Sequence, residues 1–301
     1  MKYPKRKGRS CCDIDQINHV HIMKISEFES RYLAFLEATR SKAYVRDNRV
    51  AFAWLKKTVG DIPLVELKVS NLEPIFATEF GRASHNAARI FRTLKAAFSK
   101  SVAWNESAEN PFTKFKLPRI PETSIPFLKN TDLEKLLNQN IAEDLKLLFE
   151  FAFYTGLRQG EILNLRWDSV NVPELTITVS NTDDFTTKSK RERIIPINRN
   201  LLDVLNRIRK MNNNMATQKY VFQRRNGNYV ARQFKKSVRL AGLDEHLHFH
   251  CLRHSFASNL IRAGVNPVHV KQLMGHSNLA TTLKYTHVDI DDLRGAVSKL
   301  D

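Results

Sequence analysis

The sequence predicts a mainly α-helical protein with a helical N-terminal domain and a C-terminal α+β domain that holds a small antiparallel β-sheet. The chain has 301 residues, and single hydrophobic cores usually stop growing at about 250 to 300 residues. Apolar residues recur at helical spacing along most of the chain, whereas apolar and polar residues alternate over 175–180. We expect a basic arm over 1–20, a helical domain over 21–110, a proline-rich linker over 111–126 and the α+β domain over 127–301.

The first two helices of the N-terminal domain are predicted from a capping box and from helix breakers. Ser26 with Glu29 three residues later forms the capping box that opens the first helix. A second helix is expected over 42–58, because Gly60 and Pro63 follow it as breakers.

The third and fourth helices are expected on either side of Gly81. Ser70 with Glu73 forms a capping box for a short helix that stops near this glycine. Ser84 starts a longer helix, and its apolar stripe comprises Ala87, Phe91, Leu94 and Phe98. Basic residues line one flank of this helix, namely Arg89, Arg92 and Lys95.

The linker is predicted from its prolines at positions 111, 118, 121 and 126. Proline every few residues forbids regular helix and favours an extended, semi-rigid strap. Lys114 and Lys116 add positive charge to this segment.

The C-terminal domain is predicted to contain two helices, a β-hairpin and then further helices. Residues 145–154 are so apolar that their helix must be central, and Gly156 ends it. Leu175, Ile177 and Val179 alternate with polar residues as in a half-buried strand, and residues 193–197 return as its partner. The helical pattern resumes at Leu201, and a later helix has Asn266 as N-cap and Pro267 at its first position.

Several classes of protein are excluded by composition. No apolar run reaches the roughly 18 residues that span a bilayer, and no signal-peptide segment follows the basic start. The three cysteines, Cys11, Cys12 and Cys251, include an adjacent pair and cannot form a disulfide framework, which fits a reducing cytoplasm. His246, His248 and His250 alternate beside Cys251, but nothing supplies a fourth ligand at metal spacing. We therefore expect a cytoplasmic protein without a membrane partner and without a metal site.

The net charge of +17 is shared by both domains. Residues 1–125 carry +9 and residues 126–301 carry +8. Positive charge in two successive domains favours two surfaces that close on one polyanion, most simply duplex DNA, although a soluble basic protein would show the same total. Arg89, Arg92, Lys95, Lys114 and Lys116 are the candidate DNA-binding residues, and a solvated charged face is the alternative for the helix flank.

Four short clusters in the C-terminal domain carry the residues that suggest chemistry. They are TGLRQGE at 155–161, TKSKRER at 187–193, HCLRH at 250–254 and LMGHS at 273–277, with Tyr285 nine residues beyond His276. Each cluster alone fits a structural role. Their joint occurrence in this order in one basic domain is far more specific.

This set resembles the active-site pattern of the tyrosine recombinase (phage integrase) family from about Lys24 to the C-terminus. The matching residues are Arg158, Lys188, His250, Arg253, His276 and Tyr285. The resemblance implies a helical core-binding domain that binds DNA, followed by a catalytic domain. It also implies site-specific recombination of duplex DNA through a 3'-phosphotyrosine intermediate, without ATP, metal or other cofactor. Its partners would be a specific target site and a homotetramer on synapsed DNA, from a chain that is monomeric or dimeric when free.

The chemistry of phosphodiester attack supports the resemblance. Charge builds on the nonbridging oxygens, and the guanidinium groups of Arg158 and Arg253 would clamp them. Tyr285 would be the nucleophile, which needs a base because the pKa of a phenol is about 10. The resemblance assigns His250 as base or proton shuttle and His276 as a hydrogen-bond donor to a nonbridging oxygen.

Two supporting residues leave alternatives open. Lys188 would protonate the leaving 5'-oxygen, but Lys190 lies only two residues away on the same strand face. Glu161 falls where the family carries an acidic residue, and one helical turn separates it from Arg158. It would orient that guanidinium or form a plain salt bridge.

Two other functions fit parts of the pattern. A type IB topoisomerase-like enzyme shares the chemistry but relaxes DNA as a monomer, and a non-cleaving relative would only bind DNA. Leu293, Val297 and Leu300 form a terminal apolar stripe that would dock on its own domain or on a neighbouring subunit, which favours recombination.

Overall fold

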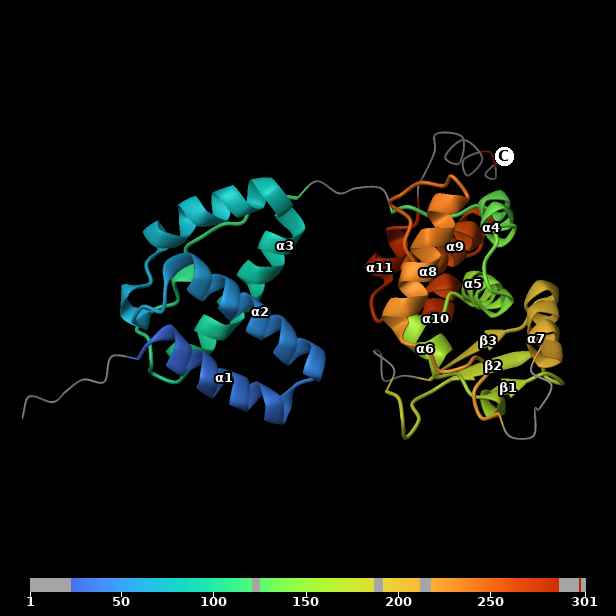
Figure 1. Cartoon of the computed structure of the whole chain (residues 1–301), viewed down its shortest axis with the longest axis horizontal. Coiled ribbons are helices and arrows are strands. Elements are labelled where there is room, and N and C mark those ends of the chain that lie inside the picture. The colour runs from blue at the N-terminus through green and yellow to red at the C-terminus, as the bar shows by residue number, and fades with distance from the viewer. Residues whose placement is uncertain (1–22, 121–124, 187–191, 212–217, 287–297, 299–301) are drawn as a thin grey trace, which may run out of the picture. The chain divides into compact units, whose positions relative to one another are not determined.

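The computed structural model describes residues 23–120, 125–186, 192–211, 218–286 and 298. The chain forms two compact units, 1–122 and 123–301, which are coloured blue to green and green to red in Figure 1. The predicted basic arm, Lys188, Lys190 and the terminal apolar stripe lie outside the described residues. The mainly helical fold with one small antiparallel sheet confirms the predicted fold class.

The N-terminal unit packs three helices around an aromatic core (Figure 1). These helices are α1 (Ile25–Thr39), α2 (Lys42–Val59) and α3 (Val69–Ala103), with a 3-10 turn, η1 (Leu64–Glu66), between the last two. Phe28, Phe52, Phe98 and Phe112 are fully buried where the three helices meet. Burying a side chain of this size stabilises the unit by about 1.5 to 3 kcal/mol.

Both capping boxes predicted for this unit were wrong. Lys24 is the N-cap of α1, and its amide donates to Glu27 at 3.1 Å, while the Ser26 hydroxyl donates to Asp61 at 2.7 Å. Lys68 is the N-cap of α3, and its amide donates to Asn71 at 3.2 Å. In both cases the helix begins earlier, because a side chain three residues beyond the true N-cap already satisfies a free amide.

The third and fourth predicted helices are one interrupted helix. Helix α3 continues through Gly81 and departs from helical geometry at Ala83 (φ −154°, ψ 71°). The predicted break was therefore two residues too early, and it is a kink rather than a loop. The predicted stripe of Ala87, Phe91, Leu94 and Phe98 is buried, as expected.

The first part of the proline-rich segment packs against the N-terminal unit. Asn110 caps a 3-10 turn, η2 (Pro111–Thr113), because its side chain accepts from the Phe112 amide at 3.0 Å. The ring of Phe115 lies 5.1 Å from that of Phe91 between centroids. Residues 111–115 are thus not an extended strap, since proline at the first position suits a short helical turn.

The C-terminal unit surrounds one central helix with further helices and a small sheet. Its helices in the described residues are α4 (Asn130–Leu137), α5 (Glu143–Thr155), α6 (Gln159–Leu163), η3 (Trp167–Ser169), α7 (Arg199–Met211), α8 (Gly227–Leu240), α9 (His250–Arg262), α10 (Pro267–Met274) and α11 (Leu279–Leu283). Helix α5 contacts α7 and α9, which confirms its predicted central place.

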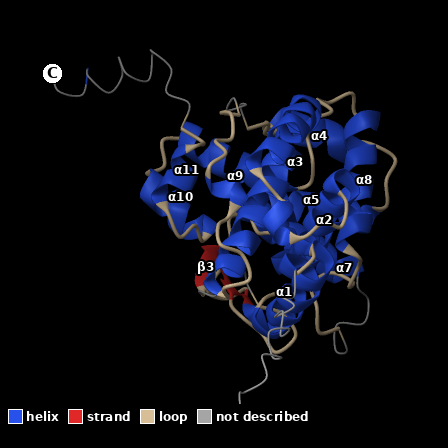
Figure 2. Ribbon diagram, turned by 90° about the vertical axis from the view of Figure 1, so that its left-hand side faces the viewer, coloured by secondary structure: helices blue, strands red, loops and turns tan. Residues whose placement is uncertain are grey.

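The sheet has three antiparallel strands in the order β1-β2-β3. They are β1 (Val170–Asn171), β2 (Thr176–Val179) and β3 (Arg193–Pro196), and Ile177 pairs with both Val170 and Ile195. The sequence did not predict β1, which has only two residues. Leu175 was wrongly placed in the strand: it has φ 50° and forms the turn before β2. Strand β3 lies beside α10 (Figure 2), which brings the hairpin to the site described next.

Candidate active site

The first site residue is fixed by a glycine turn at the end of α5. Gly156 has φ 61°, and a Cβ atom there would lie 2.4 Å from Cδ1 of Phe256. Only glycine fits both the left-handed backbone and this close approach. The turn makes Arg158 the N-cap of α6.

Arg253 is held by backbone carbonyls from two different elements. Its side chain is buried, with the residue 2% exposed, and Nη1 donates to the Gly156 carbonyl at 2.7 Å while Nη2 donates to the Met274 carbonyl. Burial and the nearby charge of Arg158 lower the pKa of Arg253 to about 9. Its described hydrogen bonds go to carbonyls, so its positive charge remains available to an anion.

Tyr285 lies within this group of cations. The residue is 5% exposed, and its ring packs against that of His276 with centroids 6.3 Å apart. Burial raises the pKa of the phenol, whereas the charges of Arg253 and Arg158 act to lower it. The structure therefore brings together four of the six predicted residues, Arg158, Arg253, His276 and Tyr285.

His276 follows the left-handed Gly275 at the end of α10. Its Nδ1 lies 2.9 Å from the Thr282 hydroxyl. Burial and the charges of Arg253 and Arg158 lower the pKa of His276 to about 4, so the ring is neutral at pH 7. If the Thr282 hydroxyl donates to Nδ1, the proton sits on Nε2, which is then a hydrogen-bond donor.

The histidine in contact with the phenol is one that the sequence reading did not assign. His254 Nδ1 lies 2.7 Å from the Tyr285 hydroxyl, whereas His250 is exposed and packs its ring on that of His254 at 4.8 Å. Burial, then the neighbouring His250, lower the pKa of His254 to about 3. The spacing of His250 and His254, four residues apart on one helix, was the available signal.

Glu161 contacts Arg158 as expected, but it also pairs with a residue that the sequence reading missed. Its carboxylate accepts from the Arg158 amide at 2.9 Å and from Arg158 Nη1 at 3.0 Å. Arg193 at the start of β3 binds the same carboxylate with Nη2 at 2.5 Å. Burial raises the pKa of Glu161, but the bonds and charges of Arg193 and Arg158 outweigh it and hold the pKa below its usual value.

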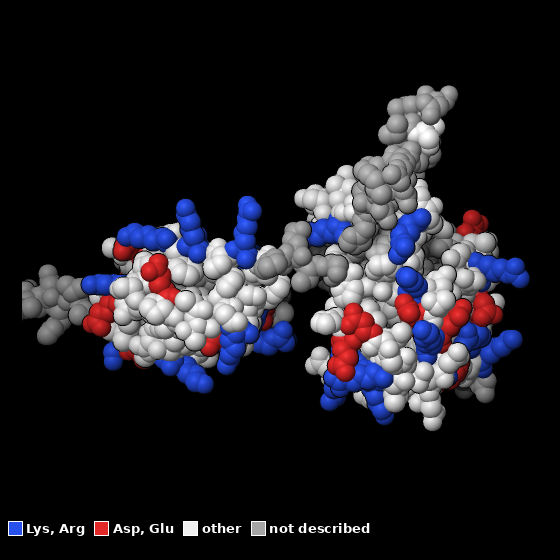
Figure 3. All heavy atoms as spheres, turned by 90° about the horizontal axis from the view of Figure 1, so that it is seen from above, with Lys and Arg blue, Asp and Glu red and all other residues white. Residues whose placement is uncertain are grey.

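The predicted DNA-binding residues lie on the N-terminal unit with partners of their own. Arg89 pairs with Asp47 at 3.3 Å and Lys114 with Glu109 at 2.7 Å. Arg92 and Lys116 are exposed, and Lys95 is half-buried. Lysine and arginine side chains project along two edges of this unit in Figure 3. On the C-terminal unit, helix α8 adds an exposed pair that the sequence reading did not single out, Arg232 and Lys236.

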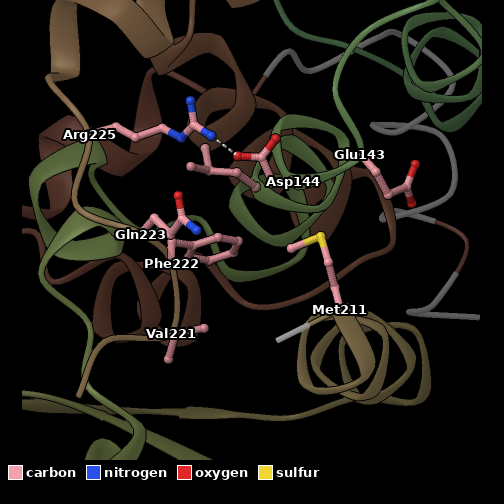
Figure 4. Close-up of a pocket in the computed structure, with 8 residues that line it drawn as sticks. Glu143, Asp144, Met211, Val221, Phe222, Gln223 and Arg225 are labelled. Carbon is pink, nitrogen blue, oxygen red and sulfur yellow. Dashed lines mark hydrogen bonds and ion pairs between the residues drawn. The ribbon is translucent and has the colours of Figure 1, made fainter. Parts of the chain in front are cut away.

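Two other features of the C-terminal unit lie apart from this cluster. His246 pairs with Asp244 at 2.8 Å, and the described residues contain no group of three or more metal-ligating side chains. A pocket of about 310 Å³ lies between α5, the end of α7 and residues 221–225, and it is lined by Phe222 and by the ion pair of Arg225 and Asp144 (Figure 4). Because these charges neutralise each other, the pocket is not built for a phosphate.

The chain resembles known proteins along most of its length. The tyrosine recombinase of Thermosipho africanus is 29% identical over 293 residues, which cover 92% of this chain and 99% of that protein. Tyrosine recombinase XerC of Alcanivorax borkumensis is 28% identical over 251 residues, 78% of this chain and 80% of that one. In the described residues no helix is long and apolar enough to cross a membrane.

Solved structures share the fold. The Tn1549 transposon integrase in complex with transposon right end DNA superposes with a TM-score of 0.79 at 19% identity, covering 92% of this chain and 99% of that one. A lambda integrase tetramer bound to a Holliday junction gives a TM-score of 0.76 at 16% identity, covering 90% of this chain and 80% of that one. Residues 126–291, which contain the whole cluster described above, match the phage integrase family, and the chain belongs to that family.

Proposed function

We propose that this chain is a site-specific DNA recombinase that cuts and rejoins duplex DNA through a covalent 3'-phosphotyrosine at Tyr285. One observation carries the proposal: the Tyr285 phenol is buried where the charges of Arg253 and Arg158 act on it. A surface tyrosine has no such surroundings. The same cations that offset part of the rise in the phenol pKa suit the phosphate that it would attack.

The proposed reaction is an in-line displacement at phosphorus. The Tyr285 oxygen forms a bond to phosphorus while the bond to the 5'-oxygen breaks, and Arg158 and Arg253 bind the nonbridging oxygens. His276, neutral at pH 7, donates a hydrogen bond to one of them. Lys188 protonates the departing 5'-oxygen. A 5'-hydroxyl from another strand then reverses these steps and joins new ends.

The phenol must lose its proton, and two histidines are arranged for this. His254 is the first acceptor because it already contacts the Tyr285 hydroxyl at 2.7 Å. Its low pKa makes it a weak base in the resting protein. His250, with its ring against that of His254 and more exposed, is the next group in the relay and the base that the family resemblance assigns.

Binding and assembly complete the proposal. The helical N-terminal unit binds the core of the target site, with Arg89, Arg92, Lys95, Lys114 and Lys116 as phosphate contacts. Four copies exchange strands on synapsed DNA, as the tetrameric lambda integrase complex suggests, and the free chain is a monomer or dimer. A DNA substrate and a free buried Cys251 favour the cytoplasm.

A nicked suicide duplex tests the proposal, with candidate sites taken from the DNA that flanks the gene. Wild-type protein should form a protease-resistant adduct, and Tyr285→Phe should bind the duplex without forming one. An adduct from Tyr285→Phe would count against the assignment. Plasmid relaxation by a monomer that never joins two sites would instead indicate a type IB topoisomerase-like enzyme, and binding without any adduct would indicate a non-cleaving relative.

A further inference from the structure

Arg193 contacts three parts of the active site although none of the chemistry above uses it. Its side chain is 7% exposed. Nη2 and Nη1 bind the two carboxylate oxygens of Glu161 at 2.5 and 3.2 Å, and Nε donates to the Leu273 carbonyl at 3.0 Å. A Cβ atom on Gly275 would lie 3.1 Å from Cδ of Arg193, so the guanidinium fits closely against the turn before His276.

The pairing with Glu161 sets the charge that Arg158 presents. The Glu161 side chain is 1% exposed and accepts from both arginines. Arg193 makes the two-pronged contact, while Arg158 makes a single side-chain contact at 3.0 Å. Arg193 donates two hydrogen bonds to the Glu161 carboxylate, so only one side-chain nitrogen of Arg158 is bound to it. The remaining donors of Arg158 therefore stay available to a phosphate. Without Arg193, Glu161 would face Arg158 alone and draw its guanidinium inward.

The contact with Leu273 holds the other side of the site. Helix α10 ends with carbonyls that have no partner within the helix. Arg193 binds the Leu273 carbonyl, and Arg253 binds the Met274 carbonyl of the same turn. Since β3 lies beside α10 (Figure 2), Arg193 connects the hairpin, the start of α6 and the turn that carries His276.

We propose that Arg193 is a positioning residue for the recombinase reaction, which orients Arg158 through Glu161 and holds the turn that carries His276. The inference rests on the function proposed above. Arg193 is too buried to be a DNA contact, and lysine would not replace it, because one ammonium group cannot bind a carboxylate with two parallel bonds and a carbonyl with a third.

The test compares two nicked suicide duplexes in single-turnover reactions. One has a normal scissile phosphodiester, and the other a methylphosphonate, which lacks one charged nonbridging oxygen and so depends less on Arg158. Arg193→Gln should form adduct about 10- to 100-fold more slowly on the phosphodiester, as when residues that orient metal ligands are lost. On the methylphosphonate the loss should be about threefold or less, and the Kd for DNA should change by less than about twofold.

Three further variants sharpen the test. Arg193→Lys keeps the positive charge and should show the same pattern with a smaller loss, even if Arg193→Gln folds poorly. Glu161→Gln with Arg193→Gln should lose no more than the worse single variant, because both act through one contact. Arg207→Gln is the matched control, since Arg207 binds Glu150 at 2.8 Å and Glu143 at 3.1 Å in the same unit; its rate should stay within about twofold of wild type.

Several results would overturn the inference. They are wild-type rates from both Arg193 variants, an equal loss on the two substrates, or losses that multiply in the double variant. An equal loss on the two substrates would mean that Arg193 does not act through Arg158, and losses that multiply would mean that it acts independently of Glu161. Failure of the wild-type chain to form any adduct would overturn the proposed function itself, and this inference with it.

Discussion

Replacing Gly156 by alanine should strongly destabilise the C-terminal unit. The size of this destabilisation follows from the backbone conformation at Gly156 and from the contact that a new methyl group would make. A left-handed backbone costs an L-residue about 1 to 2 kcal/mol, and Gly156 has φ 61°. The new methyl group would also meet Phe256 at 2.4 Å, and forcing extra volume into a packed site costs about 1 to 3 kcal/mol. We expect Gly156→Ala to lower the free energy of unfolding by about 2 to 5 kcal/mol.

Gly242 provides the matched control for this prediction. It has φ 63°, but nothing lies within 4 Å of a Cβ atom built there. Gly242→Ala should therefore show only the backbone cost of about 1 to 2 kcal/mol. Any gain from a stiffer unfolded chain is common to both variants and cancels in the comparison. The difference between them measures the clash with Phe256.

Urea unfolding measures both variants. Two of the three tryptophans, Trp54 and Trp104, lie in the N-terminal unit. With these replaced by phenylalanine, the fluorescence of Trp167 reports on the C-terminal unit alone. Phe256→Ala should cost less stability in the Gly156→Ala background than in the wild type, since it removes Cδ1 and Cγ, the ring atoms nearest the new methyl group. Equal destabilisation by Gly156→Ala and Gly242→Ala would refute the argument from close packing.

Three further outcomes are expected. His254 and His276 have pKa values of about 3 and 4 in the folded chain. An unfolded histidine has a pKa of about 6.5 and therefore binds more protons than the folded one below that pH. The free energy of unfolding should fall as the pH drops from about 6.5 towards 4. Urea titrations at pH 7, 6, 5 and 4 should show that the free energy of unfolding of His254→Gln falls less steeply with pH than that of the wild type. The same pH dependence in both proteins would contradict this. Arg253→Lys should slow adduct formation by about 100- to 1,000-fold in single-turnover assays, because one ammonium group cannot reach both the Gly156 and Met274 carbonyls; a loss under tenfold would argue against a clamp. Lys188→Ala should cleave slowly, and a bridging 5'-sulfur substrate should restore its rate because a thiolate leaves without a proton; if only Lys190→Ala behaves this way, Lys190 is the general acid.

Local signals in the sequence predicted the elements that depend on neighbouring residues. The helix over 42–58 is observed as Lys42–Val59, and Asn266 with Pro267 opens α10 as expected. The capping box predicted from Ser26 and Glu29 was wrong, because several residues near a helix start can cap it and tertiary contacts decide which one does. Ser26 is used by Asp61, 35 residues away, which no local pattern contains.

Local sequence patterns could not predict all the contacts inside the site, because some of them join residues that are far apart in the sequence. The family resemblance singled out Arg158 and Glu161, and their separation of three residues predicted their contact, but Arg193 lies 32 residues beyond Glu161. A weak signal existed: alternation along the returning strand puts Arg193 on the same face as the buried Ile195. A charged residue on the buried face of a strand requires a partner, and the sequence does not say which carboxylate it is.

The charges at the centre of the site explain why it should bind a phosphate. Arg158, Arg193 and Arg253 lie near one carboxylate, that of Glu161. Burial lowers the pKa of Arg253 most, and the positive charges of Arg158 and Arg193 lower it further. A scissile phosphate would supply the missing negative charge, and the further charge that develops on its oxygens during attack would be stabilised more strongly still. Burial raises the pKa of the Tyr285 phenol, and the charges of Arg253 and Arg158 offset part of that rise. The excess of positive charge therefore favours binding of the phosphate, whereas removal of the phenol proton still requires a base such as His254 or His250.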